Sequence, residues 1–177
     1  MPNKAVKFAP SGRRLLAPLA VNSNVSQSWK IIMNNTSNIF THMLAKYSAS
    51  IFDKNVTNYV NLYSEDVLIF DMWNDWYVQG LNQWQDMAKG WFESLNTERV
   101  LVTASEIQSI QTGDIIVGHA ILRFAAISSE GVELRYLNNR VSVCMRNFGG
   151  EWKIFHQHSS VPIDSKSIQV KFHFDQV

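Results

Sequence analysis

Apolar residues recur every three or four positions in three segments between residues 37 and 95, the spacing of amphipathic helices. The first predicted helix covers about 37–53, and Asn55 is placed to cap a second, shorter one. The third covers about 82–95. Each helix has one apolar side, so we expect all three to pack against a common core.

The rest of the chain has the composition of strands. Residues 67–73 form a run rich in β-branched and aromatic side chains, and four longer strands are expected at 99–110, 115–127, 132–147 and 151–161. Glycine-containing turns separate the four longer strands, as in hairpins. Helices that precede an antiparallel meander predict an α+β fold. Strands this long should bend, giving a cone-shaped sheet wrapped on the helices, with one cavity at its open mouth.

Composition narrows the function classes. The chain has 177 residues, enough for one domain, and Cys144 is its only cysteine, which excludes an intrachain disulfide. No apolar run approaches the roughly 20 residues that cross a bilayer, so we expect no membrane association. Residues 1–30 hold five basic residues and no acidic one, whereas the remainder holds 11 of the 16 basic and all 15 acidic residues. This mildly acidic body argues against nucleic-acid binding.

The charge pattern also suggests the domain organisation. Residues 1–30 are predicted to form a flexible basic segment, with an organellar targeting signal as the alternative, and residues 31–177 to form a single domain. We expect a cytoplasmic location unless residues 1–30 act as a targeting signal.

The closing strand carries the most specific pattern. Trp152-Lys153-Ile154 is followed by His156, His158, Ser160 and Pro162. Together with the element order, this pattern resembles the SnoaL-like, ketosteroid-isomerase-like branch of the nuclear transport factor two superfamily over about residues 37–164. The resemblance implies a cystatin-like, cone-shaped α+β barrel, usually a homodimer packed through the outer sheet face. The family contains cofactor-independent isomerases, cyclases and dehydratases, and also non-catalytic association domains.

Strand alternation selects the first candidate site residues. Trp152, Ile154, His156 and His158 share one face, which is predicted to be the cone interior unless a bulge shifts the register. The two imidazoles would then act as general acid or base, bind a metal with His119 or Asp71, or only brace the barrel. We predict no bound metal and no cofactor.

Three further candidates follow from position and resemblance. Asp71 ends an otherwise apolar strand, and it serves either as a general base with a raised pKa or as a turn cap. The resemblance assigns an oxyanion donor to the first helix, where Tyr47 lies on the apolar side; the alternative is a core tyrosine. Arg140 is predicted to face the cavity, where it would pair with Asp71 or bind a substrate carboxylate, unless it is exposed.

Substrate contacts are expected from aromatic and polar side chains. They are Trp73, Trp84, Trp91 and Phe92, with His119, Asn138 and Ser142 from the later strands. For the helix aromatics the alternative is ordinary packing on the sheet. Val141, Val143, Met145 and Phe155 are predicted to form an apolar outer face that pairs two copies.

Two functions remain open from the sequence. The first is a small-molecule-binding isomerase, cyclase or dehydratase that acts by acid/base chemistry on an apolar carbonyl-containing or carboxylate-bearing ligand. The second is a non-catalytic dimerisation or association module with a vestigial pocket. The observation that separates them is open volume beside the candidate polar groups.

Overall fold

The helices lie close to their predicted places. The computed structural model describes residues 39–174, so the segment 1–30 and the predictions for it lie outside the described residues. Helix α2 spans Ile39–Phe52, α3 spans Val56–Val60 and α4 spans Leu81–Ser94. Asn55 caps α3 as predicted, because its side chain accepts the backbone N–H of Asn58 at 2.9 Å.

Six strands form one sheet. They are β1 (Tyr63–Phe70), β2 (Val78–Gln79), β3 (Arg99–Thr112), β4 (Ile115–Ile127), β5 (Glu133–Phe148) and β6 (Glu151–Ser160). Their order is β2-β1-β6-β5-β4-β3, and every pair is antiparallel except β1 with β6. The predicted α+β class is therefore confirmed. The sheet is mixed and not closed, because β2 and β3 are its two edges.

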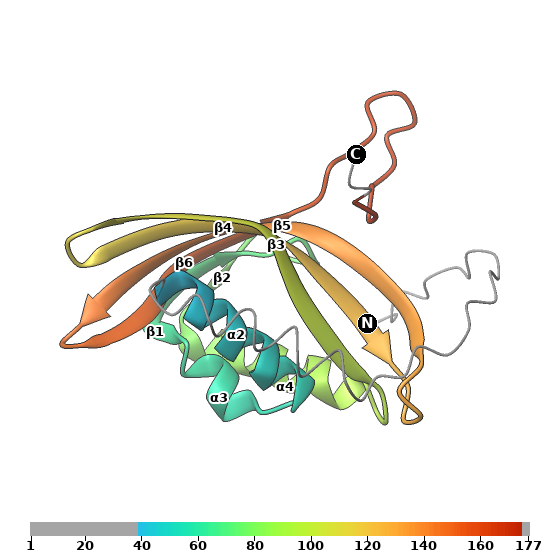
Figure 1. Cartoon of the computed structure of the whole chain (residues 1–177), viewed down its shortest axis with the longest axis horizontal. Helices are drawn as coiled ribbons and strands as arrows, with labels where there is room; N and C mark the ends of the chain where they lie inside the picture. The colour runs from blue at the N-terminus through green and yellow to red at the C-terminus, as the bar shows by residue number, and fades with distance from the viewer. Residues whose placement is uncertain (1–38, 175–177) are drawn as a thin grey trace.

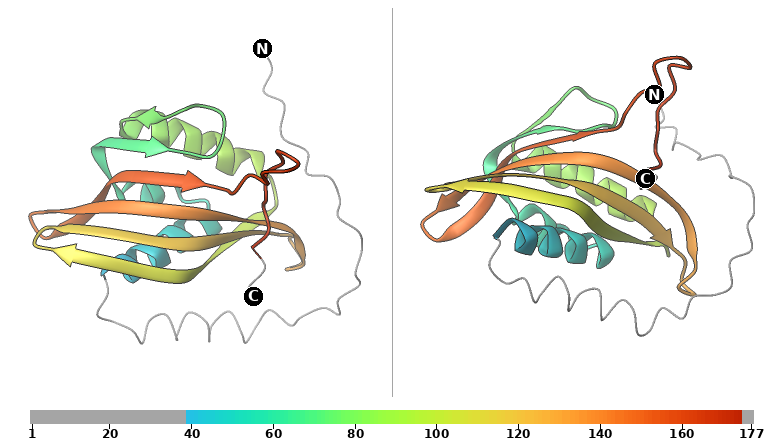
Figure 2. Two further views of the ribbon diagram at one scale, coloured as in Figure 1. Left: turned by 90° about the horizontal axis from the view of Figure 1, so that it is seen from above. Right: turned by 45° about the horizontal axis from the view of Figure 1, so that its top comes forward.

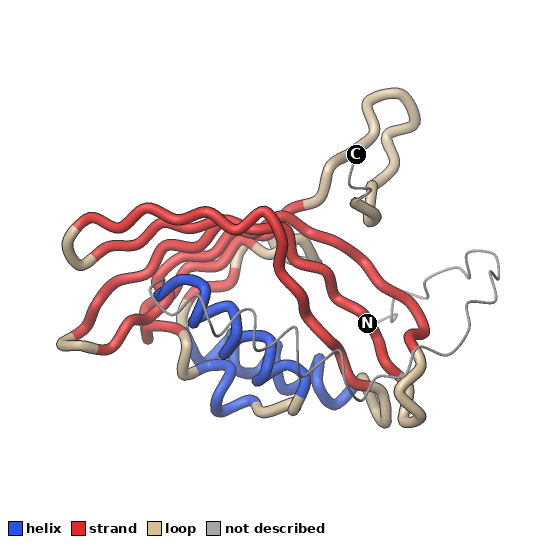
Figure 3. Tube along the Cα trace, viewed as in Figure 1, coloured by secondary structure: helices blue, strands red, loops and turns tan. Residues whose placement is uncertain are grey.

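The sheet bends over the helices, which all lie on its concave side (Figures 1 and 3). The core between the two layers includes Phe40 and Ile51 from α2, Val67 from β1 and Ile154 from β6, each fully buried. The Ser48 hydroxyl of α2 donates to the carbonyl oxygen of Val102 in β3 at 2.6 Å, which ties the helix to that strand.

A β-bulge in β6 decides which side chains enter this core. Cys144 is paired with His156, whereas the next residue, Met145, is paired with Ile154, so Phe155 is an extra residue. Ile154 faces the concave side, and beyond the bulge Gln157 and Ser159 take that side. His156 and His158 are consequently on the convex outer face, and the prediction that their imidazoles point inward is wrong.

The facing of β5 also differs from the prediction. Val141, Val143 and Met145 are buried in the core. The alternate positions, including Arg140 and Ser142, are exposed on the outer face, as is His119 on β4. The apolar residues of β5 face the core, and the polar residues that alternate with them face outward, because burying a guanidinium without a partner is costly. The predicted apolar outer face of Val141, Val143 and Met145 is therefore wrong. Phe155 does lie there, under the Arg146 guanidinium at 4.9 Å.

A close contact between α2 and β4 offers a test of the packing. Gly118 is buried on β4, and a Cβ atom built there would lie 2.7 Å from three atoms of the Phe40 ring. We expect Gly118→Ala to lower the free energy of unfolding by about 1–3 kcal/mol. Urea unfolding followed by circular dichroism measures the change.

Gly90 in α4 supplies the matched control, since a Cβ there meets nothing within 4 Å. Gly90→Ala should raise the free energy of unfolding by about 0.5–1 kcal/mol, because alanine favours a helix more than glycine does. A Gly118→Ala protein that unfolds at the wild-type midpoint would contradict the packing of Phe40 on this strand.

Candidate functional site

A cluster of tyrosines lies in the core between the helices and β1. Tyr47 of α2, Tyr59 of α3 and Tyr63 of β1 stack in sequence, with ring centroids 5.4 and 5.6 Å apart. The Trp84 indole of α4 packs against the last two rings at 5.9 and 5.7 Å. All four side chains are buried, so their polar atoms depend on one another for partners.

The hydroxyl groups form a network that ends at the bulged strand. Tyr63 donates to Oε1 of Gln157 at 2.9 Å, and Nε2 of Gln157 donates to the Ser159 hydroxyl at 3.4 Å. Burial raises the pKa of Tyr47, Tyr59 and Tyr63 well above the ordinary value of a phenol, and hydrogen bonds with Tyr59 oppose the rise at the other two. All three hydroxyls therefore remain protonated donors at neutral pH.

Asp71 lies at the rim of this network. It directly follows β1, and its side chain is partly buried. Burial raises the pKa of the Asp71 carboxyl, and a hydrogen bond from the Met72 backbone opposes the change. The negative charge of Asp71 in turn contributes to the raised pKa values of Tyr47 and Tyr63, which places the carboxylate within electrostatic range of the network.

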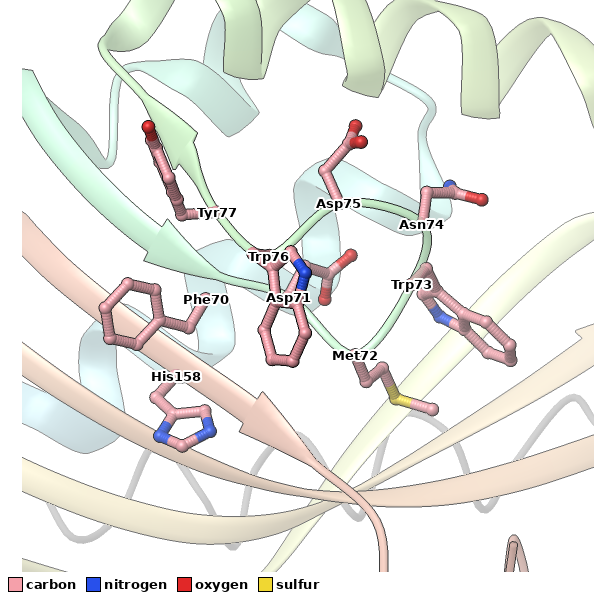
Figure 4. A pocket seen from close by; sticks show the side chains of 9 residues that line it. All are labelled: Phe70, Asp71, Met72, Trp73, Asn74, Asp75, Trp76, Tyr77 and His158. Atoms are coloured by element: carbon pink, nitrogen blue, oxygen red, sulfur yellow. The ribbon is translucent and has the colours of Figure 1, made fainter.

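An open hollow of about 600 Å³ lies beside Asp71, within the loop that joins β1 to β2 (Figure 4). Its lining combines four aromatic residues with polar ones: Phe70, Asp71, Met72, Trp73, Asn74, Asp75, Trp76, Tyr77 and His158. Trp76 is 93% exposed, so a large apolar ring stands at the entrance without packing. This combination of apolar walls and a few polar groups suits a small organic ligand.

Three of the predicted site residues meet at this hollow: Asp71, Trp73 and His158. His158 borders it from the outer face, beside the Phe70 ring at 5.8 Å. His156 contacts the same ring at 5.1 Å, and its Nδ1 lies 2.8 Å from the Leu68 carbonyl oxygen, so its partner is the backbone.

The other predicted residues are divided between the core and the outer face. Tyr47 and Trp84 belong to the buried network, whereas Trp91 packs on Phe92 at 5.0 Å, the packing alternative. Asn138 is covered by the C-terminal segment: its backbone N–H donates to the Phe172 carbonyl at 2.6 Å. Its Oδ1 accepts the Phe174 N–H at 3.2 Å. Arg140, Ser142 and His119 lie on the outer face and do not line the hollow.

Sequence reasoning missed four polar residues of the interior: Tyr59, Tyr63, Gln157 and Asn139. The two tyrosines were recognisable as the apolar side of the second helix and the start of the first strand. Nothing in the sequence marks the bulge that turns Gln157 inward. The Asn139 amide donates to the Met72 sulfur at 3.5 Å, and its buried Oδ1 has no donor partner among the described residues.

The indole N–H of Trp84 likewise lacks a partner at hydrogen-bond geometry within the described part of the chain, although it is near enough to lower the pKa of Tyr63. Residues 39–174 contain no group of three side chains arranged to hold a metal ion. None of the helices in this range is long and apolar enough to span a bilayer.

The bond between Tyr63 and Gln157 can be tested by stability. Tyr63→Phe leaves the buried Gln157 amide oxygen without its donor, so we expect a loss of about 1–3 kcal/mol in the free energy of unfolding. Tyr77→Phe changes an exposed ring and should leave the urea midpoint unchanged. In a Gln157→Leu background the cost of Tyr63→Phe should shrink; an equal cost in both backgrounds would contradict the bond.

The family model of the SnoaL-like domain matches residues 40–164. No curated protein is significantly similar in sequence to this chain.

Solved structures share the fold at low sequence identity. An NTF2-like protein of unknown function from Pseudomonas putida KT2440 is 17% identical, with a TM-score of 0.67, over 87% of this chain and 99% of its own. A proposed scytalone dehydratase from Novosphingobium aromaticivorans DSM 12444 is 10% identical, with a TM-score of 0.61, over 85% and 93%.

A third solved structure carries a different description. It is a proposed calcium/calmodulin-dependent protein kinase II association domain from Xanthomonas campestris, 14% identical with a TM-score of 0.53, over 66% of this chain and 81% of its own. The resemblance found in the closing strand is confirmed by the family model, and the chain belongs to the SnoaL-like domain family, with a fold of the nuclear transport factor two-like type.

Proposed function

We propose that this protein binds a small, largely apolar carbonyl compound at the mouth of the cone and transfers a proton at the carbon next to the carbonyl. The observation that supports this proposal is the position of Asp71. Its carboxyl, with a raised pKa, lies between an open aromatic hollow and a buried set of hydroxyl donors. A carboxyl group with a raised pKa is better suited to general acid/base catalysis near neutral pH than an ordinary aspartate.

In the proposed reaction the Asp71 carboxylate accepts the proton from the α-carbon, and the bonding electrons move onto the carbonyl oxygen. Tyr47 would stabilise this developing oxyanion, because its buried hydroxyl keeps its proton. The proton then returns from Asp71 to the substrate. Return to a different carbon gives isomerisation, and its delivery to a departing hydroxyl gives dehydration. Neither outcome requires a cofactor.

The hollow supplies the other binding contacts. Phe70, Trp73 and Trp76 would contact the carbon skeleton, and His158 lies at the edge where a polar substituent would emerge. Arg140 has no part in this proposal, because it is exposed on the outer face. The predicted contact between Arg140 and a substrate carboxylate is therefore not part of this proposal.

The non-catalytic alternative has one observation in its favour. Tyr63 and Gln157 satisfy each other, and Tyr59 joins Tyr47 to the same network, so these four side chains have partners without a ligand. A protein similar in fold is described as an association domain. In this alternative the hollow is vestigial, and the tyrosine network only stabilises the fold.

We also propose that two copies associate through the convex outer face, as the family resemblance implies. The residues first assigned to that contact are mostly in the core, so other side chains must carry it. The cytoplasmic location remains a prediction from the sequence.

The raised pKa of Asp71 predicts a pH-dependent stability. A carboxyl with a higher pKa in the folded state holds its proton more tightly there, so its favourable contribution is lost as pH rises from about 4 through the folded pKa. Above its folded pKa the wild type carries a charged, partly buried carboxylate, which disfavours the folded state. Asp71→Asn should therefore unfold at higher urea than wild type at pH 7, and the gain should disappear below about pH 4.

Asp75→Asn, an exposed change in the same loop, should show no such pH-dependent gain. A stability difference between Asp71→Asn and wild type that stays constant from pH 3 to pH 8 would contradict the burial of this carboxyl.

Proton abstraction can be measured without knowing the product. The protein is incubated in D₂O with a panel of cyclic and aromatic ketones, and exchange of the α-proton is followed by proton NMR. We expect wild type to catalyse exchange on at least one member, Asp71→Asn to be slower by about 100-fold or more, and Asp86→Asn, an exposed change on α4 outside the hollow, to be unaffected. Binding of panel members without exchange, at any pH from 5 to 8, would favour the non-catalytic alternative.

A further inference from the structure

The chain continues beyond β6 into a short hairpin, residues 162–171, that we call the C-terminal arm. Ile163 pairs with Val170 as an isolated β-bridge, and the Lys171 N–H donates to the Pro162 carbonyl at 2.9 Å. The arm stands on the convex side of the sheet and extends away from it (Figures 1 and 2).

Asp164 organises the turn of the arm. Its Oδ1 accepts the backbone N–H groups of Lys166 and Ser167, both at 3.0 Å, and the Ser167 hydroxyl at 3.1 Å. Its other oxygen forms an ion pair with Lys171 at 2.9 Å. These bonds hold the pKa of the Asp164 carboxyl below its usual range. The arm is thus a defined hairpin rather than a loose tail.

The base of the arm is attached to the body. Asn138 binds the backbone of residues 172 and 174, the Phe172 ring stacks on Trp73 at 5.7 Å, and the His173 ring meets Tyr136 at 4.7 Å. These contacts fix the position from which the arm leaves the outer face.

The arm exposes apolar side chains that the body does not cover. Ile168 is 73% exposed, and Ile163 and Val170 are also exposed; we call these three residues the arm patch. A two-stranded hairpin is marginally stable alone in water. A hairpin with an ordered turn and solvent-exposed apolar side chains is typical of a segment that contacts another protein surface.

A second apolar patch lies on the same outer face, toward the other end of the sheet. Ile110 of β3 is 75% exposed and pairs with Val117 of β4, which is exposed opposite Cys144 of β5. Phe148 at the end of β5 is exposed beside Arg146. We call Ile110, Val117 and Phe148 the distal patch. Ten residues of β5 separate Asn138, at the base of the arm, from Phe148, a span of roughly 30 Å.

The middle of the outer face is polar. The strand register aligns His119, Ser142 and His158 in one row across β4, β5 and β6, and Arg140 lies in the next row. Within the described residues Arg140 has no ion pair, so this region carries uncompensated positive charge. Two such regions facing each other would repel, and attraction between copies must come from the ends of the face.

We propose that the arm patch of one copy packs on the distal patch of a second copy, in a two-fold dimer. The two-fold axis lies in the plane between the two sheets and runs perpendicular to the strands. Rotation about it places the arm of each copy over the distal patch of the other copy. Because both faces are convex, they diverge toward their ends, and a projecting arm is what spans that gap (Figure 1). The two-fold symmetry produces this contact twice in each dimer, so both contacts contribute to the association.

This inference rests on the proposed association of two copies, and the experiment separates the two claims. Sedimentation equilibrium of the full chain gives the dimer dissociation constant for wild type, for an arm variant (Ile163→Ser with Ile168→Ser) and for a distal variant (Ile110→Ser with Val117→Ser). All four side chains are exposed, so wild-type urea midpoints are expected. Each variant should raise the dissociation constant at least tenfold. Val132→Ser, an exposed position outside both patches, should leave it unchanged.

Mixing the two variants gives the decisive result. Each variant's own dimer lacks both arm contacts, but a heterodimer regains one, between the intact arm of the distal variant and the intact distal patch of the arm variant. We expect heterodimers to predominate over either homodimer. A monomeric wild type at all concentrations would overturn the association itself. A wild-type dimer that neither variant weakens, or variants that form no heterodimer, would overturn the arm contact alone.

Discussion

The extra residue in β6 is the feature on which both faces of the sheet depend. With Phe155 accommodated as a bulge, Ile154 and Gln157 both face the core although they are three residues apart. An unbroken alternation would instead bring the His156 and His158 imidazoles inward and turn Gln157 out. The buried Tyr63 hydroxyl would then lose its amide acceptor, and ionisable rings would need new partners in the core. The bulge therefore keeps a neutral amide inside and leaves the imidazoles at the surface.

The loop that joins β1 to β2 is linked to the C-terminal segment. Trp73, two residues after Asp71, stacks on Phe172, and the backbone of Phe172 is bound to Asn138 on β5. The loop that carries the proposed base is thus held on one side by the segment that supports the arm. In the proposed dimer, contacts of the arm would restrain this segment, so association and the position of Trp73 are physically connected.

Local periodicity was sufficient to predict where the helices and strands lie. It was not sufficient to predict which side chains of β5 and β6 face the core. The predicted 37–53 and 82–95 correspond to Ile39–Phe52 and Leu81–Ser94, because a 3.6-residue repeat is visible within one segment. The parallel pairing of β1 with β6 joins segments nearly 90 residues apart, which no local pattern records. A bulge adds one residue without a sequence signal, and it reverses every later side chain.

Arg140 shows a different kind of error. Val141, Val143 and Met145 alternate with it, and burial of the apolar set was the simpler interpretation of that pattern. Placing the guanidinium in the cavity required a partner that the fold does not provide. The position of Asp71 was predictable for the opposite reason, since a carboxyl that ends an apolar strand lies at the end of that strand whatever the register of its neighbours.

Most polar groups of the tyrosine network already have hydrogen-bond partners. Whether Tyr47 can still donate to a substrate depends on which hydroxyl in the network donates to which. Tyr63 uses its single proton on Gln157, so its oxygen remains to accept from Tyr59. Tyr59 has one proton for two neighbours, and a hydroxyl proton rotates at little cost. When Tyr59 donates to Tyr63, Tyr47 completes the chain by donating to Tyr59. When Tyr59 donates to Tyr47 instead, the proton of Tyr47 is left for another acceptor, and an oxyanion within its reach would favour that state. One rotation could therefore convert a structural hydrogen bond into a catalytic one without moving any heavy atom.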